Sequence, residues 1–162
     1  MTLKSAVLLA ILFATAGSPL AAQAAQTDQP ESAVEQWQED PAQIFDATEV
    51  EIEDFRWLAR PVVVFADTEA DPRFRQQMER IRSRIDVLAD RDVVVITDTD
   101  PSARSDARQA LRPRGFMLAL ISKDGSVIQR KPLPWDVREI SRSIDKLPLR
   151  QQEIRDRDQI GE

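Results

Sequence analysis

Three continuous apolar runs, separated by helix-forming segments, constrain the fold of this chain more than any other feature of its sequence. The runs are PVVVF (61–65), DVVVIT (92–97) and FMLALIS (116–122). The first two are rich in β-branched residues, and short apolar runs without polar alternation are typical of strands buried on both faces. Strands of this kind need helices on both faces of their sheet, so we expect an α/β domain.

The segments between the runs carry helix signals. Apolar residues recur at helical spacing after the first run, at Phe74, Met78, Ile81, Ile85 and Leu88. Asp71 and Pro72 precede this stripe as an N-cap and a first-turn proline, which predicts a helix start. Asp100 and Pro101 repeat the arrangement, so a shorter helix is expected from there to about Leu111.

The C-terminal third predicts a hairpin and a last helix. Asp124 and Gly125 separate the third run from SVIQRK (126–131), and this dipeptide favours a two-residue type I′ turn. An amphipathic helix is expected over 137–147, ending at Pro148. The resulting order β-α-β-α-β-β-α is that of a thioredoxin-like core. It predicts a mixed sheet of four strands, or five with the segment around Val50 and Ile52, flanked by helices.

The first 24 residues have the pattern of a signal peptide. Lys4 precedes the apolar run AVLLAILFATAG, and Ala22-Gln23-Ala24 offers small residues at a cleavage site. The run is too short for a membrane-spanning helix, which needs about 20 residues. We therefore expect a periplasmic or secreted protein, cleaved near Ala24, with no transmembrane segment after cleavage. An uncleaved anchor is the alternative.

The charge of the chain is unevenly distributed. Residues 25–54 contain ten acidic side chains and no basic one, whereas residues 55–162 contain 21 basic and 18 acidic side chains. The sequence predicts an acidic, largely disordered arm over 25–54, a folded domain over 55–150 and a charged tail over 151–162. Docking of the arm on the domain as a lid is one hypothesis for this asymmetry.

The sequence contains no cysteine and no histidine. Thiol redox chemistry and cysteine-bound metals need a thiolate, so thiol oxidoreductase and thiol peroxidase activities are excluded for this sequence. Histidine, the usual base near neutral pH, is missing as well. We expect a protein without catalytic residues and without a cofactor, unless carboxylates bind Ca²⁺ or Mg²⁺.

Four stretches resemble a known family, and they lie between residues 56 and 153: RWLARPVVVFADTEADPRFRQQ, LADRDVVVI, LISKDGSV and SIDKLPLRQQE. They resemble the bacterial secreted domain-of-unknown-function family 4174, which is similar to the thioredoxin-like DUDES domains of animal sushi-repeat and coiled-coil-containing extracellular proteins. The resemblance covers about residues 55–155. It implies a thioredoxin-like fold, export and no redox cysteine pair, and it brings no catalytic residues. Ser122 departs from the glycine that the family often has there.

Carboxylates follow the first two predicted strands at what we expect to be one edge of the sheet. They are Asp67, Glu69, Asp71, Asp98 and Asp100. Ligands of open α/β sheets bind at this carboxyl edge, and Ca²⁺ prefers oxygen ligands. The five residues are candidate metal ligands, although helix capping by Asp71 and Asp100 explains two of them without a metal.

Arginines are concentrated on the two predicted helices that follow these strands. The candidates for binding an anion or a partner are Arg73, Arg75, Arg80, Arg104 and Arg108. A guanidinium can grip a carboxylate or phosphate in two places, so an anionic ligand or protein partner would fit. A solvated face with local ion pairs is the simpler interpretation. Nucleic acid is not expected as a partner of an exported protein.

A further set of residues is predicted to have structural roles. Asp124 and Gly125 form the hairpin turn, while Arg150 pairs with a carboxylate and holds the C-terminal segment, with Asp145 and Glu153 as its neighbours in the sequence. Taken together, the sequence favours an exported, non-redox thioredoxin-like binding or interaction module. A cation-dependent enzyme or a Ca²⁺-binding protein that uses the acidic edge is the alternative.

Overall fold

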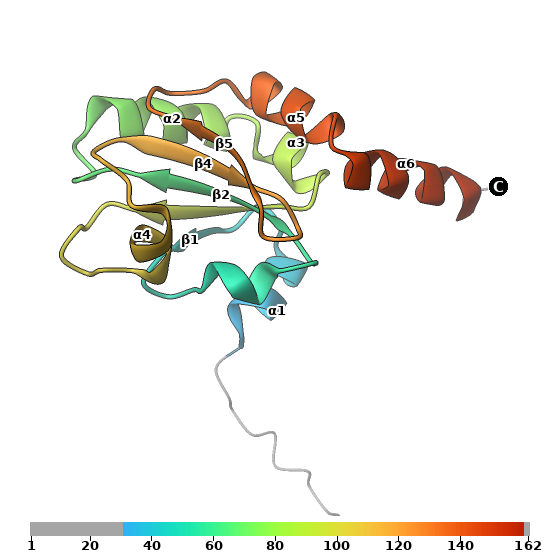
Figure 1. Ribbon diagram of the computed structural model, residues 1–162, viewed down its shortest axis with the longest axis horizontal. Coiled ribbons are helices and arrows are strands. Elements are labelled where there is room, and N and C mark those ends of the chain that lie inside the picture. The colour runs from blue at the N-terminus through green and yellow to red at the C-terminus, as the bar shows by residue number, and fades with distance from the viewer. Residues whose placement is uncertain (1–30, 161–162) are drawn as a thin grey trace, which may run out of the picture. The chain divides into compact units, whose positions relative to one another are not determined.

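The computed structural model describes residues 31–160, which contain one mixed five-stranded sheet (Figure 1). Its strands are β1 (Ile44–Asp46), β2 (Arg60–Phe65), β3 (Val93–Asp98), β4 (Met117–Ile121) and β5 (Val127–Lys131). The spatial order is β1-β3-β2-β4-β5. β1, β3 and β2 run parallel, and β4 pairs antiparallel with both β2 and β5. The predicted signal peptide, 1–24, and residues 25–30 lie outside the described residues.

Helices cover both faces of the sheet and bury two apolar clusters. On one face lie α2 (Pro72–Arg82), α3 (Ile85–Ala89) and α5 (Val137–Asp145), which pack on Val62 and Val64 of β2. On the other lie α1 (Ala33–Glu39), the 3₁₀ helix η1 (Ile52–Phe55) and α4 (Asp106–Leu111), which pack on Val63 and Phe65. Alternate side chains of β2 therefore enter opposite clusters, and every β2 residue is buried. The predicted thioredoxin-like α/β fold is confirmed.

The prediction of a largely disordered arm is wrong for residues 31–54. Ser32 and Glu35 form a capping box that starts α1, and Trp37 of this helix is buried against Phe55. The fifth strand is β1, parallel to β3 and with Phe45 in the core, and not the predicted segment around Val50 and Ile52, where Ile52 begins η1. These apolar residues are scattered among acidic ones, so the local composition resembles disorder although the side chains complete the core.

Two predicted helices differ from those observed. The stripe from Phe74 to Leu88 is divided into α2 and α3 at Arg84, whose φ of −145° and ψ of 35° are not helical. The helix expected from Asp100 begins instead at Asp106, with Ser105 as its N-cap. Ser102 donates its backbone N–H to Asp100 Oδ1 at 2.8 Å, so Asp100 closes a local turn and caps no helix.

The C-terminal segment also departs from prediction. Pro148 does not end the helical region but begins α6 (Pro148–Ile160), because proline suits the first turn of a helix. The domain boundary predicted at residue 150 therefore falls inside a helix. The hairpin has a three-residue loop closed by the Ser122 N–H on the Ser126 carbonyl at 2.8 Å. Gly125, with φ of 87°, is the residue of the Asp124–Gly125 pair with a positive φ, so the turn is not type I′.

Among the described residues, no helix is long and apolar enough to cross a membrane.

Candidate functional site

Asp98, the last residue of β3, is held at the carboxyl edge of the sheet by two residues from the α4 region. Arg108 donates Nε and Nη2 to Asp98 Oδ1 at 2.9 and 2.6 Å, and Ser105 Oγ donates to Oδ2. Arg108 Nη2 also donates to the Ala66 carbonyl at 2.7 Å. The side chains of Asp98 and Arg108 are 3% and 11% exposed. This buried pair joins the ends of β2 and β3 to α4 and leaves neither group free for a ligand.

The other four carboxylates predicted at this edge do not converge. Asp71 caps α2 and forms an ion pair with Arg73 at 2.9 Å, and the hydrogen bond from Arg73 lowers its pKa. The hydrogen bond from Ser102 likewise lowers the pKa of Asp100. Asp67 is 62% exposed and lies 3.7 Å from Arg108 Nη1, and Glu69 is exposed.

The predicted metal site is therefore wrong. Its five members were Asp67, Glu69, Asp71, Asp98 and Asp100, and among residues 31–160 no three Asp or Glu side chains are placed to hold a metal ion. The physical reason is that arginine and serine donors from the same loops and helices already bind Asp71, Asp98 and Asp100. Capping and ion pairing thus take the oxygens that a cation would need.

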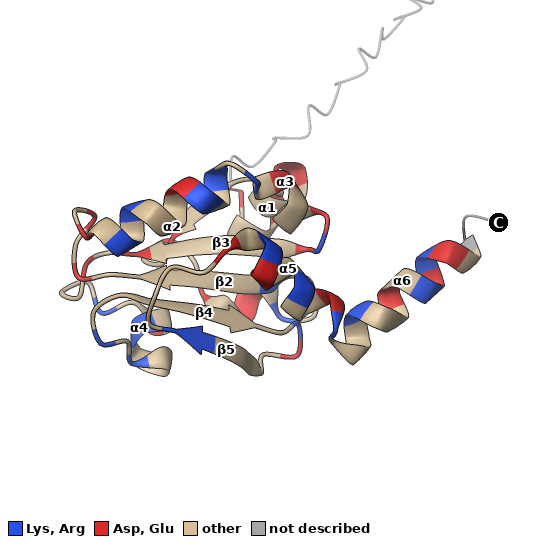
Figure 2. Ribbon diagram, turned by 90° about the horizontal axis from the view of Figure 1, so that it is seen from above, with Lys and Arg blue, Asp and Glu red and all other residues tan. Residues whose placement is uncertain are grey.

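The predicted arginine surface is divided between the two faces of the sheet. Arg73, Arg75 and Arg80 lie on α2, while Arg104 precedes α4 and Arg108 lies on it. Arg75 donates to the Ala70 carbonyl at 2.7 Å and Arg80 to the Pro134 carbonyl at 3.1 Å. Figure 2 shows basic and acidic residues interspersed along α2, with no continuous basic strip. The five arginines do not form one anion-binding surface.

An open cavity lies next to the Asp98–Arg108 pair, and sequence reasoning missed it. It has a volume of about 490 Å³ and lies between the 47–54 segment and the start of α4, with Ser105 in its lining. Its charged lining consists of one arginine, Arg104, and four carboxylates, Glu49, Glu51, Asp54 and Asp106. None of the four forms an ion pair or a side-chain hydrogen bond with another residue of the described chain. We call this feature the acidic cavity.

Most residues of the acidic cavity were missed because they were assigned to a disordered arm. The available signal was the alternation around Val50 and Ile52. Val50 is 6% exposed and Ile52 packs against the core, whereas Glu49 and Glu51 are exposed. The apolar residues fix this segment on the sheet, and the carboxylates between them are left at the surface, where like charges raise the local negative potential.

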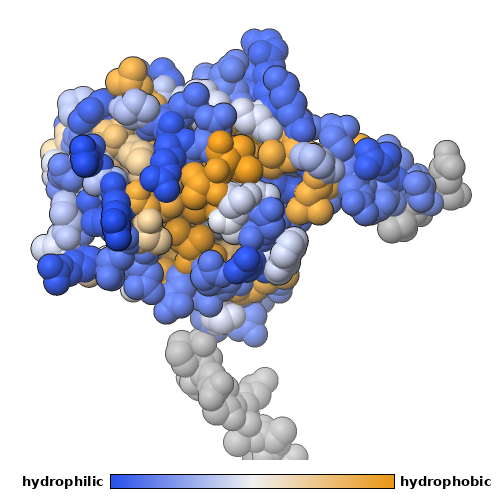
Figure 3. All heavy atoms as spheres, in the orientation of Figure 1, coloured by the Kyte–Doolittle hydropathy of each residue, from blue (hydrophilic) through white to orange (hydrophobic). Residues whose placement is uncertain are grey.

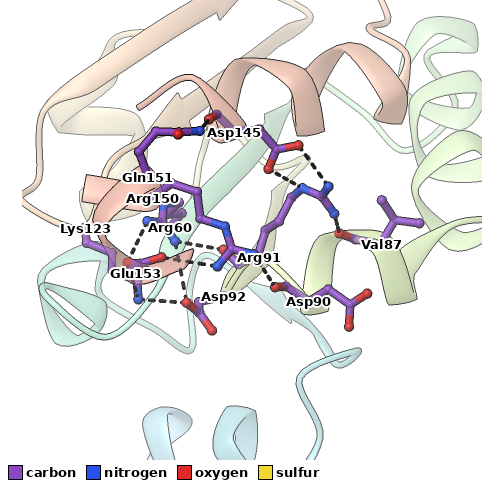
Figure 4. Close-up of polar contacts among 10 residues, drawn as sticks. All are labelled: Arg60, Val87, Asp90, Arg91, Asp92, Lys123, Asp145, Arg150, Gln151 and Glu153. Atoms are coloured by element: carbon purple, nitrogen blue, oxygen red, sulfur yellow. Dashed lines mark hydrogen bonds and ion pairs between the residues drawn. The ribbon is translucent and has the colours of Figure 1, made fainter. Parts of the chain in front are cut away.

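A second polar cluster, which we call the Arg60 cluster, lies at the opposite, amino edge of β2, where Arg60 is fully buried (Figure 4). Arg60 Nη2 donates to Glu153 of α6 at 2.8 Å, and Arg60 Nη1 donates to the Arg91 carbonyl at 2.9 Å. Lys123 bridges Glu153 at 3.0 Å and Asp92 at 2.8 Å. Sequence reasoning missed Arg60, although a charged residue at the head of an otherwise apolar strand was a signal for a buried partner.

The residues assigned structural roles take part in contacts with loops and helices. Arg150 Nη2 donates to the Asp90 carbonyl at 3.0 Å, and its Nη1 lies 3.3 Å from Glu153. Asp145 accepts two hydrogen bonds from Arg91, both at 2.9 Å. The hydrogen bonds from Ser126 lower the pKa of Asp124 in the hairpin loop. The contacts of Asp145 and Arg150 attach α5 and α6 to the amino edge of the sheet.

Trp57 is an exposed and strained residue near the same hairpin. The residue is 64% exposed and its φ is +66°, a left-handed conformation that is unusual for a bulky residue. The Trp57 N–H donates to the Lys123 carbonyl at 2.7 Å, which holds the backbone in place. Because Glu153 and Asp92 fix Lys123, the Arg60 cluster also fixes the position of Trp57.

Comparison with known proteins identifies one family and a shared fold. The model of a family described as a domain of unknown function (DUF4174) matches residues 51–153. No curated protein matches the chain. A Plasmodium yoelii thioredoxin peroxidase I superposes with a TM-score of 0.50 at 18% identity, over 64% of this chain and 81% of that one. A reduced Plasmodium vivax 2-Cys peroxiredoxin gives 0.53 at 12% identity, over 64% and 85%. At these identities the likeness concerns the fold alone.

Proposed function

The chain belongs to the DUF4174 family, and from this premise we propose that it is an exported, non-redox binding module built on a thioredoxin-like fold. The absence of cysteine from the sequence supports the non-redox part, since thiol redox catalysis needs a thiolate. The signal-peptide pattern of residues 1–24 supports export to the periplasm or beyond.

The observation that supports a binding role is the contrast between two features at the carboxyl edge of the sheet, the engaged Asp98–Arg108 pair and the open acidic cavity. The buried ion pair of Asp98 with Arg108 is fully engaged in joining β2, β3 and α4. The acidic cavity beside it is open and its carboxylates have no partners among the described residues. Ligands of open α/β sheets bind outside the carboxyl ends of the strands, so this cavity is where a ligand would be recognised.

A cation-dependent enzyme is not proposed, because no specific observation favours it. The carboxylates expected to serve it are occupied by Arg73, Ser102 and Arg108. The acidic cavity does not replace them, since its acidic residues form no group that could hold a metal ion within residues 31–160.

The purified full chain is expected to reduce neither insulin disulfides nor hydrogen peroxide above the buffer rate, because it carries no thiol to cycle. A thioredoxin with its cysteine pair, assayed in parallel, shows that the assay works.

N-terminal sequencing of the exported protein is expected to begin after Ala24. Turnover of either substrate would contradict the non-redox role, and retention of Met1 would contradict export with cleavage.

A further inference from the structure

An apolar groove adjoins the acidic cavity on the face that carries η1 and α4. Its volume is about 260 Å³. Its floor is formed by Ile52, Leu111, Ile121 and Val127, with Ala107 and Ala110 of α4 along one side. In Figure 3, which has the orientation of Figure 1, apolar atoms are visible as an orange patch among hydrophilic ones on this face. Val127 is 40% exposed, so part of this surface is open to solvent.

The rim of the groove is acidic and continuous with the acidic cavity. Glu51 and Asp106 line both features, and Glu53 lines the groove as well. Three basic side chains are near. Arg130 donates to the Leu111 carbonyl at 3.1 Å, Arg56 pairs with Glu53 at 3.1 Å, and Arg104 lines the acidic cavity. Within the described residues, Arg104 forms no ion pair with Glu51 or Asp106, and the cavity has four carboxylates to this one guanidinium, so an excess of negative charge remains beside the apolar floor.

We propose that the groove and the acidic cavity together bind a peptide segment of a partner protein in which a large apolar side chain is flanked by lysine or arginine. The proposal rests on the binding role proposed above and names the class of its ligand. Charge complementarity selects a basic segment, because an acidic one would meet the carboxylates of the rim and the cavity. The apolar floor selects a large aliphatic side chain next to the basic residue.

The size of the groove favours a single inserted side chain over a compact small molecule. At about 260 Å³, the groove is smaller than the roughly 300–1,000 Å³ of typical small-molecule sites, so it accommodates side chains more readily than a cofactor. The acidic cavity extends the same surface by about 490 Å³ of open, polar space. An extended segment can place its apolar side chain in the groove and its charged side chain in the cavity at the same time.

The test uses the full chain and a short synthetic peptide that alternates lysine and leucine, titrated by isothermal calorimetry. Two further peptides serve as probes, one with serine for leucine and one with glutamate for lysine. We expect saturable binding of the first peptide and at least about tenfold weaker binding of the other two. Added salt is expected to weaken the binding, because it screens exposed charges.

Variants then locate the binding on the protein. Val127→Asp places a charge at the apolar floor and is expected to weaken binding about tenfold. Glu51→Gln combined with Asp106→Asn is expected to weaken it severalfold and to reduce its salt dependence. Leu133→Ser and Glu79→Gln are the matched controls, one exposed apolar and one exposed acidic residue outside the groove, and both are expected to bind as the parent does.

Three results would overturn the proposal. They are equal binding of the serine-containing peptide, unchanged binding by the groove variants, and self-association that Val127→Asp abolishes, which would identify a second copy as the occupant. Each of these leaves the proposed non-redox binding role standing with another ligand. Turnover of disulfides or peroxide would instead contradict that role and leave the peptide result unaffected, so the two failures are distinguishable.

Discussion

Asp98→Asn is expected to lower the free energy of unfolding by about 3 kcal/mol, because removing one partner of a buried ion pair leaves the other charge uncompensated. The Asp98 side chain is 3% exposed, and its partner Arg108 also donates a hydrogen bond to the Ala66 carbonyl. The substitution keeps the shape of the side chain and removes its charge. Urea denaturation at neutral pH, followed by circular dichroism, measures the change.

Asp67→Asn is the matched control for this experiment. Asp67 faces the same guanidinium at 3.7 Å but is 62% exposed, so its loss is expected to change stability by less than about 0.5 kcal/mol. The double variant Asp98→Leu/Arg108→Met removes both buried charges, and it is expected to be more stable than Asp98→Asn. A loss below about 1 kcal/mol in Asp98→Asn would contradict the view that this pair fastens α4 to the sheet.

The central strands could be predicted from the sequence because their signal is local. β2, β3 and β4 each coincide with a continuous apolar run, and a residue buried on both faces of a sheet is apolar wherever it occurs in the chain. β1 and α1 carried no such signal. Their core residues, Trp37 and Phe45, stand alone among acidic neighbours, and burial becomes visible only once the sheet they cover exists.

The candidate site was less predictable, because its chemistry depends on which groups meet in space. Asp98 was correctly expected at the carboxyl edge of β3, but its role was decided by Arg108, which comes from α4 and satisfies it. A carboxylate assigned to a metal and a guanidinium assigned to an anion proved to be partners. Spacing along the chain cannot decide between these outcomes, since both depend on the position of α4.

The Arg60 cluster illustrates the same limit at the other edge of the sheet. A fully buried guanidinium requires carboxylate and carbonyl partners, and these come from α6 and from the segment that precedes β3. The resemblance to a family drew attention to Arg150 and Glu153 as a structural pair. Only the structure shows that the closest cationic partner of Glu153 is Arg60, at 2.8 Å.

Glu153→Gln is expected to lower the free energy of unfolding at pH 7 by about 2–3 kcal/mol, because fully buried Arg60 would lose its closest carboxylate. Asp92, at 3.6 Å, and the Arg91 carbonyl would remain as its partners. Glu139→Gln is the control, since its 3.4 Å pair with Arg142 is about half exposed on both sides and is expected to contribute little.

The effect of Glu153→Gln is expected to shrink in acid. Burial alone would raise the pKa of Glu153, but hydrogen bonds and charges from Arg60 and Lys123 outweigh it and hold the pKa below its ordinary value of 4.5. A carboxylate whose pKa is lower in the folded state stabilises the fold above its unfolded-state pKa, and this contribution is lost as the pH falls through the folded-state pKa. The stability difference between the parent and Glu153→Gln, measured by urea denaturation, should therefore be full at pH 7 and decrease below about pH 4.5. A difference that is constant or grows towards low pH would show that the ionised carboxylate is not what holds Arg60 in place.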